Sequence, residues 1–198
     1  MEEFDQYAGK YQEMLEDSMV SLGGFSLYYL QQKVKVVQAT LASQEIRSIL
    51  DFGCGLGLTT LMIQEAFPSV RVVGVDISES SIKRAQQKKS TVEFRCISDE
   101  KFMRESVNKF DVVYIANVFH HIKVEERSRT IEFLKSMLTP DGVLFFFEHN
   151  PYNPITRLVV SRCEFDRNAT LISPKEFRLL LREGGCQVTN TRYLLFFP

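Results

Sequence analysis

The sequence lacks the features of a membrane protein or a nucleic-acid-binding protein. None of its uninterrupted apolar runs is long enough to cross a bilayer, so we expect no membrane contact. The 24 basic and 25 acidic residues leave a formal charge of -1. This balance has no basic excess to bind a phosphate backbone, so nucleic acid is not an expected partner. A small-molecule partner fits the composition better.

Paired cysteines and a leader segment are missing as well. The four cysteines, Cys54, Cys96, Cys163 and Cys186, form no C-x-x-C pair, and Met1-Glu2-Glu3 begins no signal peptide. We therefore expect a reduced, cytoplasmic setting and no metal site. With 198 residues and 44% hydrophobic content, the chain is long enough for one domain with a sizeable core.

The most informative segment is an apolar run followed by glycines at alternate positions. Ile49-Leu50-Asp51-Phe52 reads as a buried parallel strand, and the glycines that follow are Gly53, Gly55 and Gly57. They permit positive φ angles and close approach of a ligand to the backbone. A helix is expected from Leu58, so its N-terminus and the loop would meet at a binding site.

The spacing of these glycines separates two ligand classes. A dinucleotide site requires G-x-G-x-x-G, but the position of its third glycine carries Leu58. Asp51 followed by G-x-G-x-G resembles the first motif of the class I S-adenosylmethionine-dependent methyltransferases. A second acid, Asp76, follows the apolar strand Val70–Val75 at the distance where a carboxylate binds ribose hydroxyls. Asp76 as a mere cap of the next helix is the alternative.

The resemblance extends to two further strands. After Val92–Cys96 the family usually places an acid that binds adenine; here Asp99 is assigned that role, with Ser98 as a close rival. Phe110-Asp111-Val112-Val113 and the following His-His-Ile also resemble the family. The resemblance implies a doubly wound α/β fold with a mostly parallel sheet. It implies S-adenosylmethionine as cofactor, with these binding residues: Tyr11, Asp51, Gly53, Cys54, Gly55, Gly57, Asp76, Ile77, Ser98, Asp99, Ala116 and Asn117.

Histidines and one glutamate supply candidate bases for a methyl acceptor. His120 and His121 follow the fourth strand, and Glu148 and His149 end the fifth strand, Gly142–His149. Histidine titrates near neutral pH, so His120, Glu148 and His149 are weak candidates for the catalytic base. His121 is expected to have a structural role. Asn117 as a simple turn residue remains an alternative.

The flanking segments are expected to cover the site. Residues 1–43 read as two helices that form a lid, although aromatic stripes such as the one around Tyr11 are also typical of a plain core. Tyr29 and Lys33 are interpreted as helix surface. Residues 150–172, rich in proline and asparagine, read as an insert on the acceptor side. The candidate substrate residues are Tyr152, Arg157 and Arg167.

The usual seventh strand of the family is missing. After the helix that ends at Gly184, only the segment from Gln187 to Pro198 can form a strand. The sequence is either shortened, or this sixth strand pairs beside the fifth and leaves an apolar edge at Leu194–Phe197. A homodimer through that edge is therefore predicted.

The function expected from these features is methyl transfer from S-adenosylmethionine to a small-molecule oxygen or nitrogen, with a sugar-like or natural-product acceptor. Two alternatives remain. A module that binds the cofactor without turning it over would share every cofactor residue. A nicotinamide-dependent oxidoreductase is disfavoured by Leu58.

Overall fold

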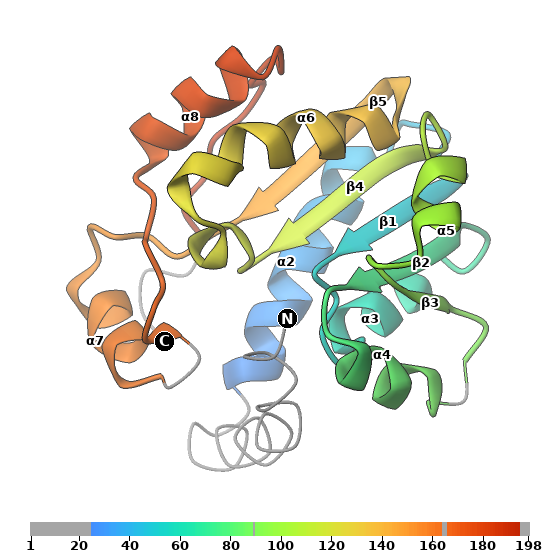
Figure 1. Cartoon of the computed structure of the whole chain (residues 1–198), viewed down its shortest axis with the longest axis horizontal. Coiled ribbons are helices and arrows are strands. Elements are labelled where there is room, and N and C mark those ends of the chain that lie inside the picture. The colour runs from blue at the N-terminus through green and yellow to red at the C-terminus, as the bar shows by residue number, and fades with distance from the viewer. Residues whose placement is uncertain (1–24, 89, 164–165, 195–198) are drawn as a thin grey trace.

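A five-stranded parallel sheet forms the centre of the molecule. The computed structural model describes residues 25–88, 90–163 and 166–194. The strands are β1 (Ser48–Phe52), β2 (Arg71–Asp76), β3 (Glu93–Cys96), β4 (Phe110–Ala116) and β5 (Leu138–Phe147). Their order is β3-β2-β1-β4-β5, and every pairing is parallel (Figure 1). The predicted doubly wound α/β fold is confirmed.

Helices alternate with the strands along the chain. They are α2 (Phe25–Leu41), α3 (Leu58–Ala66), α4 (Glu79–Gln86), α5 (Glu100–Glu105), α6 (Arg127–Met137), α7 (Pro154–Arg162) and α8 (Pro174–Glu183), with 3-10 turns η1 (Phe119–His121) and η2 (Val124–Glu126). Their starts follow local chemistry. The Ser78 side chain caps α4 by accepting from the Ser81 N–H, and Ser173 forms a capping box with Glu176 at α8.

Successive residues of a strand point to opposite faces of the sheet. Each face is covered by its own core cluster. Leu50 belongs to the core cluster that includes side chains of α5, α6 and α8. Its neighbour Ile49 belongs to the cluster that includes Val34 and Val37 of α2. The central strands β1 and β4 are nearly continuous apolar runs, as expected of a parallel sheet covered on both faces.

The order of the strands determines where a ligand can bind. From β1 the sheet extends to β2 and β3 on one side and to β4 and β5 on the other. The loops after β1 and β4 therefore diverge above adjacent strands, where Phe52 pairs with Ile115. In open α/β sheets this is the crevice in which ligands bind.

The predicted sixth strand is absent from the described part of the C-terminus. Residues 185–194 form no strand, and residues 195–198 lie outside the described range. Val188 instead packs against the core cluster beside α6 and α8. A strand needs a partner along its length, and no hairpin partner follows in the described chain. The homodimer through this edge stays a prediction that light scattering can test.

None of the helices in the described ranges is both long enough and apolar enough to span a membrane. The cytoplasmic setting stays a prediction.

Candidate functional site

The loop between β1 and α3 is a tight turn built on its three glycines. Gly53, Gly55 and Gly57 have φ angles of 77°, 52° and 74°, the left-handed region that glycine enters without strain. The N–H groups of Gly53 and Cys54 both donate to the carbonyl of Val75. A methyl group at Gly55 would meet no described atom within 4 Å, so the loop borders open space there.

Asp76 joins this loop to the end of β2. Its Oδ2 accepts a hydrogen bond from the Gly55 N–H at 2.8 Å, and its Oδ1 accepts from the Ser78 N–H at 2.9 Å. A carboxylate oxygen can accept more than one hydrogen bond, so a ligand hydroxyl can share it with a backbone N–H. The carboxylate thus positions the glycine loop, and it lies beside the open space above Gly55.

Asp51 lies under the loop and is buried, with 2% of its surface exposed. The Thr60 hydroxyl donates to its Oδ2 at 2.6 Å. Burial raises the pKa of Asp51 to about 7, although the Thr60 hydrogen bond acts in the opposite direction. Tyr114 of β4 pairs with Asp51 of β1. The Tyr114 Oη is buried without a hydrogen-bond partner in the described structure, so a polar group is needed here.

We expect the Asp51→Asn variant to gain stability over the native protein as the pH rises. The raised pKa means that folded Asp51 holds its proton up to about pH 7, whereas the unfolded side chain loses it near pH 3.9. Native stability therefore falls as pH rises through this interval, and asparagine does not titrate. Between pH 5 and pH 8 the variant should gain on the order of 2–3 kcal/mol relative to the native protein, measured by urea unfolding.

Asp111→Asn is the matched control. Burial raises the pKa of Asp111, but hydrogen bonds from Arg47 and Ser48 outweigh it and the pKa is lowered. Its stabilising effect is therefore already complete above pH 5, and Asp111→Asn should be destabilised by a constant amount from pH 5 to pH 8. Equal pH trends for the two variants would contradict a protonated, buried Asp51.

Two residues after β3, Ser98 and Asp99, already form hydrogen bonds within the protein. The Asp99 Oδ1 accepts from the Phe102 N–H at 3.0 Å and so caps α5. Ser98 is exposed, and its carbonyl accepts from the Glu100 N–H. Ile77 is 42% exposed at the end of β2. Asp99 and Ser98 both stay predicted adenine ligands, and Ile77 has the exposure that contact with a base requires.

The end of β4 is linked to helix α2. Asn117 has a φ angle of 57°, and its Oδ1 accepts from the Lys33 Nζ at 3.2 Å. Burial lowers the pKa of Lys33 to about 8. The interpretation of Lys33 as helix surface is corrected, since the side chain is half-buried and reaches the rim of the sheet. The signal in the sequence was a lysine within an amphipathic helix, at a position that can face the sheet. Ala116 is half-buried at the end of the same strand.

His120 is held between two carboxylates. Its Nδ1 lies 2.6 Å from the Glu148 Oε2, and its Nε2 lies 3.3 Å from the Asp166 Oδ1. Burial lowers the pKa of His120, but these hydrogen bonds outweigh it and raise the pKa to about 9. Glu148 Oε1 also accepts from the N–H groups of Val118 and Phe119. These bonds argue for Glu148 as a positioning group and against it as a base.

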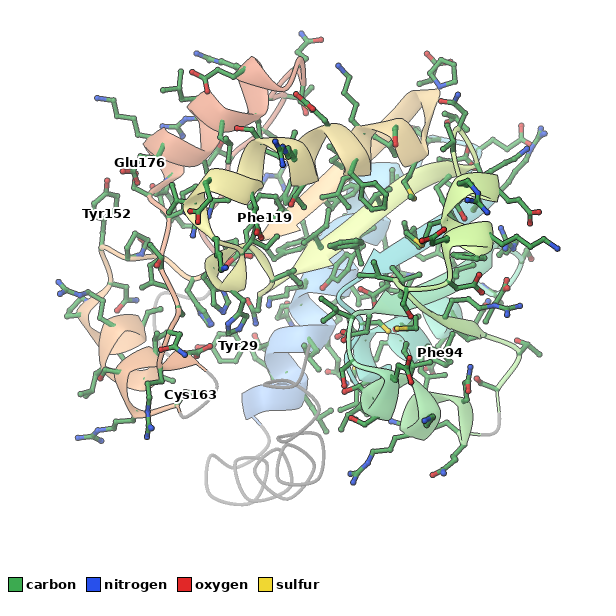
Figure 2. The ribbon with its side chains drawn as sticks, in the orientation of Figure 1. Tyr29, Phe94, Phe119, Tyr152, Cys163 and Glu176 are labelled. Atoms are coloured by element: carbon green, nitrogen blue, oxygen red, sulfur yellow. The ribbon has the colours of Figure 1, made fainter. Side chains whose placement is uncertain are left out.

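The remaining candidates lie around this pair. Burial, followed by repulsion from His120, lowers the pKa of His149 to about 4, which leaves its ring neutral at neutral pH. Arg157 and Arg167 are exposed. Tyr152 is 67% exposed and lies at the outer edge of the molecule (Figure 2). Tyr11 lies outside the described residues. Asp166 was not predicted as a site residue, and no sequence motif marks it.

A comparison of the sequence with known families matches the part of the chain that contains this site. A profile described as "Methyltransferase domain" matches residues 50–144, which run from β1 to β5 and include the glycine loop, Asp76 and the end of β4. The chain belongs to the class I S-adenosylmethionine-dependent methyltransferases.

Relatives of this methyltransferase domain include enzymes that act on oxygen. It is 28% identical over 183 residues to the ubiquinone biosynthesis O-methyltransferase of Actinobacillus pleuropneumoniae serotype 7, covering 86% of this chain and 74% of the relative. It is 33% identical over 115 residues to the malonyl-[acyl-carrier protein] O-methyltransferase of Halalkalibacterium halodurans, covering 56% of this chain and 42% of the relative. The chain spans less than half the length of the first two curated relatives that it matches.

Solved structures support the same methyltransferase fold. The plantazolicin methyltransferase BpumL, in complex with a triazolic desmethylPZN analog and SAH, matches with a TM-score of 0.66 and 20% identity, covering 90% of this chain and 72% of that chain. Mycolic acid cyclopropane synthase CmaA1, complexed with SAH and CTAB, matches with a TM-score of 0.62 and 19% identity, covering 80% and 61%. At these identities the likeness concerns the fold.

Proposed function

We propose that this domain binds S-adenosylmethionine above the carboxyl ends of β1 and β2 and transfers its methyl group to an oxygen atom of a small molecule. One observation carries the proposal: the open space over Gly55 lies beside the Asp76 carboxylate. The cradle suits a ligand that presents ribose hydroxyls to an acid and lies against bare backbone. The family membership of the chain supports the same cofactor.

Each cofactor residue then has a physical task. Asp76 accepts hydrogen bonds from the ribose hydroxyls while it keeps its bond to the Gly55 N–H. Asp51, buried behind the loop with its pKa raised to about 7, would ionise when an ammonium group of the cofactor lies nearby and would accept a hydrogen bond from it, and the unpaired Tyr114 Oη offers a nearby polar contact. The cofactor supplies a methyl group already activated on a sulfonium. The protein therefore contributes proximity, orientation and exclusion of water.

An oxygen acceptor is favoured by the relatives, since the two reported above are named O-methyltransferases. On the acceptor side, residues 150–172 include α7, where Leu158 and Val159 are exposed apolar side chains. Together with Tyr152, they would suit a natural product with an apolar part. Arg157 and Arg167 would bind an acidic group of the acceptor.

Among the three predicted bases, His149 is the one whose ring is neutral and unprotonated at neutral pH. Its ring is half-buried, and its centroid lies 5.0 Å from that of His120. His120 and Glu148 already bond one another at 2.6 Å, which commits both groups to holding the rim in place. An acceptor hydroxyl within hydrogen-bond reach of His149 would lose its proton there during transfer.

Two measurements on the native chain test the proposal. Calorimetry should detect binding of S-adenosylhomocysteine and none of NADH, because the glycine loop has no third glycine at Leu58 for a pyrophosphate. Incubation of the protein with methyl-labelled donor and a metabolite extract should then transfer label to a small molecule. Binding of NADH alone would revive the oxidoreductase. Cofactor binding without transfer to any extract would instead favour the non-catalytic module.

A further inference from the structure

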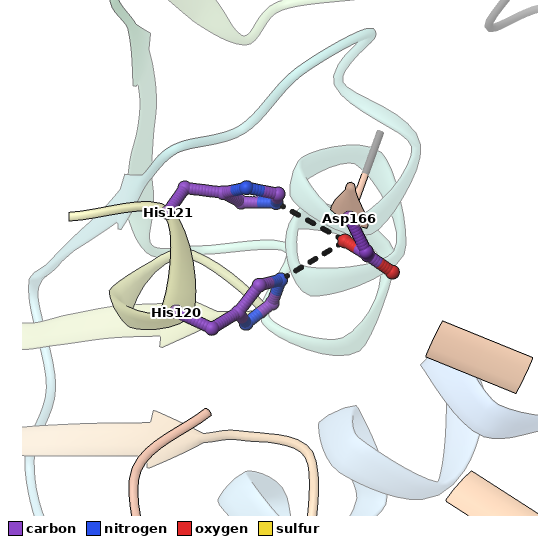
Figure 3. Close-up of side chains that lie close together, drawn as sticks. All are labelled: His120, His121 and Asp166. Atoms are coloured by element: carbon purple, nitrogen blue, oxygen red, sulfur yellow. Dashed lines mark ion pairs between the residues drawn. The ribbon is translucent and has the colours of Figure 1, made fainter. Parts of the chain in front are cut away.

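Two histidines and an aspartate converge at the rim of the sheet, outside the cofactor cradle. His120 and His121 belong to η1, directly after β4, and Asp166 comes from the segment after α7. Figure 3 shows both rings pointing toward the Asp166 carboxylate. One ligand-type atom from each side chain lies within 4.8 Å of the other two. We propose that His120, His121 and Asp166 bind a divalent transition metal of the zinc type.

The distances favour metal ligands over a simple ion pair. The Nε2 atoms of His120 and His121 lie 3.3 and 3.4 Å from the same Asp166 Oδ1. Charge-assisted N–H···O bonds are shorter, about 2.7–2.9 Å. Ligand atoms around tetrahedral zinc, each about 2.0–2.1 Å from the metal, lie about 3.3 Å apart. The two nitrogen–oxygen distances to Asp166 match the ligand spacing of such a shell.

A carboxylate already orients one of the two rings. The Glu148 Oε2 lies 2.6 Å from the His120 Nδ1, which leaves Nε2 directed at Asp166. Metal-binding histidines nearly always donate their second ring N–H to such a carboxylate or to a carbonyl, and this contact fixes the ring and its tautomer. Glu148 is therefore a positioning residue of the site, itself held by the N–H groups of Val118 and Phe119.

The segment that carries Asp166 is anchored to η1 by the backbone. The Thr170 N–H donates to the His120 carbonyl at 2.8 Å. The buried Arg127 donates to the carbonyls of Thr170 and Ile122 and so ties both segments together. Ligands from two separate parts of the chain are thus held in place before a metal binds. A pre-organised site spends less binding free energy on ordering its ligands.

The ligand types select the metal. Imidazole nitrogen suits zinc, cobalt, nickel and copper, whereas magnesium and calcium prefer all-oxygen shells. Three protein ligands leave a fourth position for water or a ligand oxygen, as in catalytic zinc sites. The proposal does not rest on methyl transfer, because metal binding is measured without cofactor or acceptor.

The test uses the full chain without a histidine tag, stripped of metal. Calorimetry should detect one Zn²⁺ ion per chain and no binding of Mg²⁺. Co²⁺ should give the intense visible absorption of a tetrahedral site, with no thiolate charge-transfer band. An absent Zn²⁺ signal, or the weak spectrum of hydrated Co²⁺, would overturn the proposal. A thiolate band would also overturn it, because Cys163 lies close to Asp166 in the chain.

Variants then assign the ligands. His121→Gln and Asp166→Asn should each weaken Zn²⁺ binding at least about 100-fold, and Glu148→Gln should weaken it about 10–100-fold. Asp141→Asn, at an exposed position of β5, should bind Zn²⁺ like the native chain. Circular dichroism checks that each variant is folded. Native affinity in both ligand variants would disprove the site, and if they do not fold, the Co²⁺ spectrum of the native chain decides.

Discussion

Asp76→Ala should lose binding of S-adenosylhomocysteine by about 100-fold or more, because the change removes two contacts at once. The ribose hydroxyls lose a charged acceptor, which is typically worth about 1.5–3 kcal/mol for each hydrogen bond. The Gly55 N–H also loses its bond of 2.8 Å, so the glycine loop is no longer held against β2. Calorimetry at constant salt measures the loss, and far-UV circular dichroism reports the fold.

Ser78→Ala is the matched control for this prediction. Ser78 lies two residues further along the chain and caps α4 through the Ser81 N–H. Removal of such a cap costs about 1 kcal/mol of stability, but no ribose contact is lost. This variant should therefore melt earlier and still bind S-adenosylhomocysteine with an affinity close to that of the native chain. If Asp76→Ala bound equally well, Asp76 would be only a helix cap.

Much of the fold could be predicted because its signals are local. Strands β1, β2 and β4 are short, mostly apolar runs that end at, or just before, a glycine, an acid or an asparagine. The helix starts are similarly readable: serine is a typical N-cap residue, and Ser78 and Ser173 have that role. Such signals need only a few neighbouring residues, so they survive without knowledge of the tertiary structure.

The predictions that were wrong, and the site residue that was not predicted, depend on partners far away in the chain. The expected strand after Gln187 is absent from residues 185–194, because strand formation depends on a neighbour that the local sequence does not contain. Lys33 was interpreted as surface, yet it bonds Asn117, a residue 84 positions away. Asp166 joins His120 across 46 positions for the same reason: a single aspartate in a loop has no periodicity or motif to mark it.

The residues of the candidate site fall into the same two groups: those that local motifs mark and those whose role depends on distant contacts. The residues of the glycine loop and Asp76 follow from motif spacing, and the structure places them next to one another. Glu148 and His120 were expected at the rim, but their 2.6 Å contact turns two candidate bases into a pair that positions each other. Which of two nearby titratable groups holds the proton depends on burial and on the partners of each group. A sequence motif does not contain that information.

Gly57→Ala should destabilise the protein by about 3 kcal/mol. Its φ angle of 74° is costly for alanine, by about 1–2 kcal/mol. The new methyl group would also lie 2.6 Å from the Phe94 ring and 3.2 Å from the Ala85 methyl group. Overpacking of a core adds about 1–3 kcal/mol. The melting temperature should fall by about 6–12 °C in a calorimetric scan.

Gly55→Ala separates the packing effect from the ligand effect. It shares the positive φ of Gly57, but no described atom lies within 4 Å of the added methyl group. Its loss of stability should therefore be only about 1 kcal/mol. Binding of S-adenosylhomocysteine should fall much more sharply, because the methyl group occupies the space assigned to the ligand.

The Phe94→Leu background identifies the cause of the Gly57 effect. If the Phe94 ring is responsible, Gly57→Ala should cost about 1–2 kcal/mol less when that ring is gone, a coupling that a double-mutant cycle measures. Additive losses would leave only backbone strain as the cause. The early third glycine would then reflect the conformation of the turn. With coupling, it reflects the close packing of α3 and α4 against β3.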